Sequence, residues 1–82
     1  MITAKEAQSI TNNYIQQEIT KHIRCIEELI TKYATEGKTS IYYGYDLPYA
    51  DPRIKNKIYV ILEEAGYYVR WCKTTLYVGW KE

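Results

Sequence analysis

The chain has 82 residues, which is the size of one small domain spanning residues 1–82. Its formal net charge is +1, so no overall charge favours binding to nucleic acid or to a membrane. No apolar run has the length of a transmembrane helix, and the opening residues contain no apolar signal core. The composition therefore predicts a small protein of the cytoplasm, with a core of marginal stability that an oligomer would support.

The first half of the chain is predicted to form one long amphipathic helix over residues 3–36. Thr3 begins this helix as its cap, Glu6 completes the spacing of a capping box, and Gly37 ends it. One face carries isoleucines that recur every three or four residues, namely Ile15, Ile19, Ile23, Ile26 and Ile30.

The length of this helix is informative. At about 1.5 Å per residue it would reach roughly 50 Å, whereas a compact domain of this size has a radius of gyration of about 12 Å. Either the helix breaks, with the poor helix formers at residues 11–13 as the expected place, or one end projects and packs on another subunit. We expect self-association through the isoleucine stripe. The alternative is two helices folded on one core.

The second half of the chain reads as strand, helix and hairpin. A run rich in β-formers predicts a strand at residues 39–43, and Asp51-Pro52 predicts the start of a helix over residues 52–65. Alternating apolar residues predict a β-hairpin over residues 67–80. The order α-β-α-β-β predicts an α+β fold, in which the long helix and the second helix pack on a three-stranded mixed sheet.

One candidate site lies at the start of the second helix. Arg53 and Lys57 are four residues apart, and a helix N-terminus favours anions. With Tyr45 and Tyr49 from the preceding loop they could hold a small anionic ligand such as a nucleotide. The alternative, which we favour, is a solvated charged face beside Asp51.

A second candidate site follows from the aromatic residues. The chain has 10 tyrosines, 2 tryptophans and no phenylalanine, and tyrosine suits surfaces that are half buried and half wet. Alternation in the hairpin places Tyr68, Arg70 and Tyr77 on one exposed face. Together with Lys55, this face could stack on the bases of a nucleic acid and neutralise the charge of its phosphates. The alternative is an ordinary cluster of cross-strand side chains.

Residues for catalysis or metal binding are few. His22 and Cys25 lie one helical turn apart, a spacing that two metal ligands could use, but only Cys72 remains to extend the set. We interpret both cysteines as reduced, packed thiols. The sequence has no nucleophile motif and no glycine-rich phosphate loop. We therefore expect no enzyme, no cofactor and no metal site.

Three short stretches carry a resemblance to known proteins. They are TAKEA at residues 3–7, GK at residues 37–38, and LEEAGYYV at residues 62–69 with Trp80 following. With these motifs the chain resembles a group of small, uncharacterised bacteriophage and prophage proteins. The resemblance implies a viral origin and a place in the cytoplasm of the infected bacterium. The virion is the alternative location, and for a phage-type interaction protein we expect a host or virion protein as partner. It implies no catalytic residues.

Residues 58–80 also resemble the recognition helix and wing of a winged-helix DNA-binding domain. That family needs two helices between its first strand and its wing, and only residues 44–66 are available for them here.

The sequence thus predicts a non-enzymatic, phage-type interaction protein. It would self-associate through the long helix and bind a partner protein or a small anionic ligand through its tyrosine-rich surface. The alternative function is a small nucleic-acid-binding module, of winged-helix or aromatic-sheet type, whose affinity would fall steeply with salt.

Overall fold

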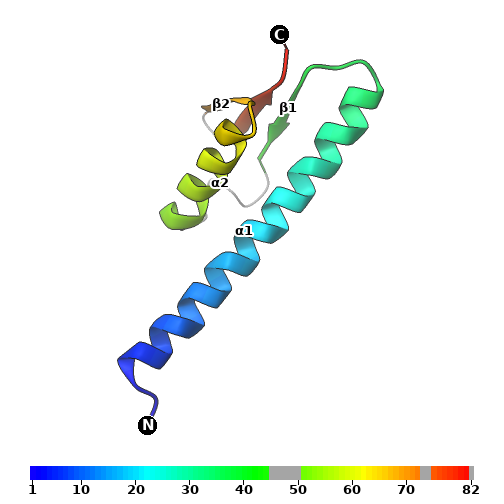
Figure 1. Ribbon diagram of the computed structural model, residues 1–82. Coiled ribbons are helices and arrows are strands. Elements are labelled where there is room, and N and C mark those ends of the chain that lie inside the picture. The colour runs from blue at the N-terminus through cyan, green and yellow to red at the C-terminus, as the bar shows by residue number, and fades with distance from the viewer. Residues whose placement is uncertain (45–50, 73–74, 82) are drawn as a thin grey trace.

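The computed structural model describes residues 1–44, 51–72 and 75–81. Its elements follow the predicted order and confirm the α+β class. They are α1 (Ala4–Thr35), β1 (Ser40–Tyr43), α2 (Pro52–Glu64), β2 (Tyr68–Trp71) and β3 (Leu76–Gly79) (Figure 1).

Helix α1 is one continuous element of 32 residues. It passes through residues 11–13 without a break, so the alternative of two shorter helices on one core is wrong. At about 1.5 Å per residue the helix is about 48 Å long, and the molecule accordingly measures 55 × 23 × 21 Å. The N-terminal turns of α1 extend beyond the other elements as a rod (Figure 1).

The helix ends have the predicted chemistry. The Oγ1 atom of Thr3 accepts the backbone N–H of Glu6 at 3.1 Å, which satisfies one of the free donors of the first turn. Gly37 follows α1 with φ +84°, a conformation that glycine adopts without a side-chain clash. The carboxylate of Asp51 accepts the backbone N–H of Arg53 at 2.8 Å and caps α2.

The sheet has the strand order β1-β3-β2, and both neighbouring pairs are antiparallel. The predicted mixed sheet is therefore wrong, because β3 lies between β1 and β2 and keeps these two strands from pairing directly. The burial of β3 explains its central place: Leu76 and Val78 are fully buried, so this strand gains most from neighbours on both sides. The hairpin between β2 and β3 is confirmed.

Both helices contact each other and pack on one face of the sheet, with α1 against β1 and α2 against β2. Alternation along β1 directs Ile41 and Tyr43 into the core and Tyr42 to the opposite face. In the described residues, no helix combines the length and apolar character that crossing a bilayer requires. The buried hydrophobic residues are Ile15, Ile19, Ile26, Ile41, Tyr43, Ile54, Ile58, Leu62, Leu76 and Val78.

Candidate functional site on the outer face of the sheet

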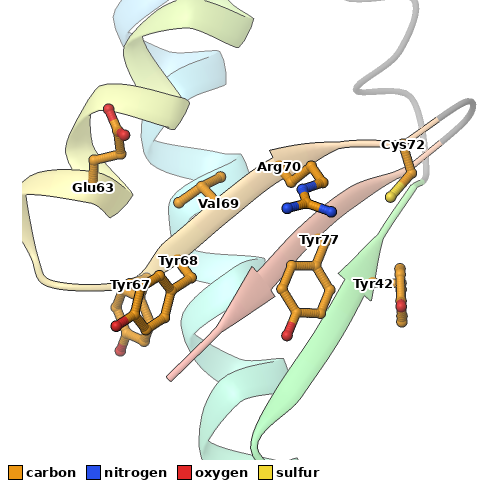
Figure 2. Close-up of a pocket in the computed structure, with 8 residues that line it drawn as sticks. All are labelled: Tyr42, Glu63, Tyr67, Tyr68, Val69, Arg70, Cys72 and Tyr77. Atoms are coloured by element: carbon orange, nitrogen blue, oxygen red, sulfur yellow. The ribbon is translucent and has the colours of Figure 1, made fainter. Parts of the chain in front are cut away.

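The face of the sheet opposite the helices carries a row of large side chains. The antiparallel register places Tyr42, Tyr77 and Arg70 opposite one another on β1, β3 and β2. Their shared phase directs all three side chains to the same face. The rings of Tyr42 and Tyr77 pack at a centroid distance of 5.3 Å, and 63% of Tyr42 stays exposed (Figure 2).

Gly79 shapes the next row of this face. It lies between Ser40 and Tyr68 in the register, and Tyr68 is 67% exposed. A Cβ atom at Gly79 would lie only 2.6 Å from the hydroxyl oxygen of Tyr77. The missing side chain therefore gives the Tyr77 ring room to lie along the sheet. We call the four residues Tyr42, Tyr68, Arg70 and Tyr77 the aromatic face.

An open hollow of about 560 Å³ accompanies this face. It reaches from Tyr42 on β1 around strand β2 to Glu63 on α2 (Figure 2). Its described lining includes one cation, Arg70, and one anion, Glu63, so their formal charges cancel. Phenol rings beside a single guanidinium can bury apolar surface while they form directional hydrogen bonds.

The predicted nucleic-acid face is assembled only in part. Tyr68, Arg70 and Tyr77 share the outer face, as alternation predicted. Lys55 does not join them, because its Nζ atom lies 4.9 Å from the ring centre of Trp71. Trp71 belongs to the helix-facing set of β2 and also stacks with Tyr59 of α2 at 6.3 Å. Lys55 therefore lies on the side of the sheet that faces the helices.

Sequence reasoning missed Tyr42 and Gly79 as parts of this face. The alternation of Ile41 and Tyr42 in β1 was the available signal for Tyr42, since a buried isoleucine places its neighbour outside. The role of Gly79 depends on the position of the Tyr77 ring, which periodicity does not give.

In the predicted anion site, the guanidinium of Arg53 is hydrogen-bonded to the carboxylate of Asp51. Arg53 donates from Nη2 to Asp51 Oδ2 at 2.8 Å and from Nε to Oδ1 at 3.1 Å. These side-chain hydrogen bonds are the largest cause of a lowered pKa of Asp51, and the hydrogen bond from the backbone N–H of Arg53 is the second. Together they lower the pKa from 3.8 to about 2. Asp51 in turn raises the pKa of Arg53. Lys57 is exposed, and Tyr45 and Tyr49 lie outside the described residues.

The isoleucine stripe of α1 is used within the chain itself. Ile15, Ile19 and Ile26 are 9%, 5% and 0% exposed and belong to the core. Ile23 and Ile30 are half-buried and pack against that core. The surface that the sequence assigned to self-association therefore holds the helix on its own domain.

His22 and Cys25 do not form the start of a metal site. The Nδ1 atom of His22 lies 2.6 Å from the hydroxyl oxygen of Tyr43, and both side chains are buried. Its Nε2 atom lies 3.7 Å from a carboxylate oxygen of Glu18. Cys25 is half-buried and Cys72 is exposed. Among the described residues, no three His, Cys, Asp or Glu side chains gather in a way that could hold a metal ion.

Comparison with known proteins finds no matching family model, no matching curated protein and no matching solved structure. The resemblances to phage proteins and to winged-helix domains therefore stay predictions. The geometry of the protein's own surfaces is therefore the basis of the functional proposal.

Proposed function

We propose that the protein is a non-enzymatic interaction module that docks a partner protein through the aromatic face. The observation that carries this proposal is the register, which aligns Tyr42, Tyr77 and Arg70 across three strands and leaves the face exposed. An antiparallel sheet commonly buries one face and presents short polar side chains to water on the other. Here large aromatic rings occupy the solvent-exposed face. Tyr and Arg are among the residue types that dominate binding hot spots.

Electrostatics favour a protein over a nucleic acid as the partner. Binding to a phosphate backbone needs several cations on one surface. In the described part of the hollow, Arg70 is balanced by Glu63, and Lys55 lies on the helix side of the sheet. A mixed surface of phenols and one arginine suits hydrogen bonding to a protein surface better. The expected partner class, a host or virion protein, stays a prediction.

Site-specific photo-crosslinking in the cells that make the protein tests this proposal. A benzoylphenylalanine probe at Tyr42 or Tyr68 is expected to capture one partner protein. The same probe at Val60, which is 41% exposed on α2, serves as the matched control. Adding Arg70→Ala should abolish the capture while the far-UV circular dichroism spectrum stays unchanged. Equal capture from Val60, or none from either tyrosine, would refute docking through this face.

Nucleic-acid binding is the competing outcome and has its own assay. Fluorescence anisotropy with single-stranded DNA and RNA oligonucleotides at low salt should show no binding. Binding that weakens steeply with salt and is lost in Tyr77→Ala would instead assign the aromatic face to base stacking.

Self-association through the long helix is the second part of the proposal. It is supported by the exposure of all residues from 4 to 14 of α1, to which the core formed by the described residues does not extend. Native mass spectrometry over a range of concentrations tests it, and we expect a dimer. The isoleucine stripe already packs on the chain's own core. Another face of α1 therefore has to form the contact between subunits.

A further inference from the structure

We infer that a second copy of this chain covers the exposed flank of α1 in an antiparallel, two-fold symmetric pair. This inference rests on the proposed self-association and names the residues that would carry it. It involves no residue of the aromatic face.

The N-terminal part of α1 needs packing that the described residues of its own chain do not supply. Ile10 and Tyr14 are 61% and 58% exposed, although both are large and apolar in part. Isolated helical segments of about a dozen residues are marginal in water, and most helical stability in proteins comes from packing an apolar face. A partner helix on Ile10 and Tyr14 would supply that packing.

A set of positions along α1 has the spacing of a helix–helix seam. The steps alternate between three and four residues, which keeps a row of side chains on one side of a helix. Tyr14, for example, directly precedes Ile15 of the core, and one residue turns the helix by about 100°. The seam therefore lies on the flank of α1 beside the core row, where Cys25 still packs against the core. It consists of Thr11, Tyr14, Glu18, Lys21, Cys25 and Glu28.

These positions are symmetric about the middle of the helix. Helix α1 spans Ala4–Thr35, so its midpoint lies between Ile19 and Thr20. A two-fold axis at this point lays two copies alongside each other over their full length. Each residue then meets the one that is equally far from the midpoint on the partner. Tyr14 meets Cys25, and Ile10, at the edge of the seam, meets Leu29.

Charge complementarity selects this arrangement over a parallel one. Nearest the axis, Glu18 of one copy faces Lys21 of the other, and the symmetry forms this pair twice. A parallel pair in register would place Glu18 against Glu18 and Lys21 against Lys21. Like charges in contact disfavour association, so the seam favours the antiparallel pair.

The surface that would receive Ile10 and Tyr14 of the second copy is already hollowed. A groove of about 490 Å³ runs beside the C-terminal half of α1, and its lining includes Cys25, Leu29 and Tyr43. The groove and the exposed pair occupy opposite halves of one helix. A two-fold axis through the middle therefore fills both grooves with the same two side chains.

Disulfide trapping tests the register directly. The variant Tyr14→Cys with Cys72→Ser carries one new thiol, which should face Cys25 of the partner. The two positions lie 11 residues apart on one helix, about 16 Å, so a bond within one chain is excluded. Mild oxidation is expected to give a covalent dimer on a non-reducing gel. Gln16→Cys with Cys72→Ser is the matched control, because Gln16 is exposed but lies on the other side of α1.

Charge reversal tests the orientation. Glu18→Lys and Lys21→Glu each place like charges together twice, so each variant alone should dimerise at least about tenfold more weakly. An equimolar mixture of the two should form a heterodimer with wild-type affinity, because every facing pair is then opposite in sign. The mixture also controls for the contact between Glu18 and His22, which the Lys variant loses whether or not it is mixed.

The outcomes separate this inference from the proposal on which it rests. Trapping at position 14 but not at position 16, together with rescue in the mixture, supports the antiparallel seam. A dimer that shows neither response would overturn the seam while self-association stands. A monomer at every concentration in native mass spectrometry would overturn both.

Discussion

The buried contact between Tyr43 and His22 allows a sharp test of the structure. The two side chains are 2% and 5% exposed, and the hydroxyl oxygen lies 2.6 Å from Nδ1. Tyr43→Phe keeps the ring but takes this hydrogen bond from a buried nitrogen, which typically costs about 1–3 kcal/mol. In a domain of this size 1 kcal/mol corresponds to about 4–8 °C in Tm. We therefore expect Tm to fall by roughly 8–16 °C for a loss of about 2 kcal/mol.

The neighbouring residue in the same strand supplies the control. Tyr42→Phe removes the same atom from a side chain that is 63% exposed, so the free energy of unfolding should change by less than about 0.5 kcal/mol. Thermal and urea unfolding followed by far-UV circular dichroism measure both variants, and the m-value should stay constant. Equal losses in the two variants, or a smaller loss in Tyr43→Phe, would refute the inward and outward assignment of β1.

Three further predictions concern the core and the helix ends. Ile26→Ala, at a fully buried site, should lower the free energy of unfolding by about 2–5 kcal/mol in urea titration, whereas Val60→Ala on the exposed face of α2 should change it by less than about 0.5 kcal/mol. Gly66→Ala should cost on the order of 1–2 kcal/mol in the same assay, because Gly66 has φ +97° and no atom of the described residues crowds the added methyl. The folded pKa of Asp51 is lowered to about 2, so its cap stabilises α2 above the ordinary carboxyl pKa near 3.8 and is lost as the pH falls through about 2. The difference in stability between wild type and Asp51→Asn should accordingly shrink between pH 5 and pH 2, and a difference independent of pH would contradict this assignment.

The sequence predicted the elements well because their signals are local. The cap at Thr3, the glycine after α1 and the Asp51-Pro52 start depend only on neighbouring residues, and each takes its predicted place. The strand order was not predicted correctly from the sequence, because alternation tells which face of a strand is buried but not which strand lies beside it. The central place of β3 depends on the apolar surface of the whole hairpin and of β1 together.

The same distinction explains the candidate site. Alternation within one hairpin was enough to group Tyr68, Arg70 and Tyr77. Tyr42 joins them only through the pairing of β1 with β3, a contact between segments far apart in the chain. Lys55 was assigned to this face by charge alone, and the packing of α2 against the inner face placed it by Trp71 instead.

The isoleucine stripe illustrates a limit of hydrophobic periodicity. A run such as Ile15, Ile19 and Ile26 shows that one face of a helix is buried, but the pattern is the same for a core and for a subunit interface. The seam proposed for the dimer has a mixed composition, in which Tyr14 and Cys25 alternate with Thr11 and three charged residues. It therefore gives no apolar period, and it becomes visible only once the core positions of α1 are known.

The two proposed surfaces have a joint consequence for binding. The seam lies on α1, whereas the aromatic face lies on the side of the sheet that the helices leave open. Because no residue belongs to both, pairing through the seam would leave two aromatic faces free, related by the two-fold axis. Two linked faces bind a repetitive partner more tightly than one, since the second contact forms at a high effective concentration. A modest face of four side chains would then suffice for firm attachment to a partner that is itself an assembly, and the long helix would serve to hold two such faces together.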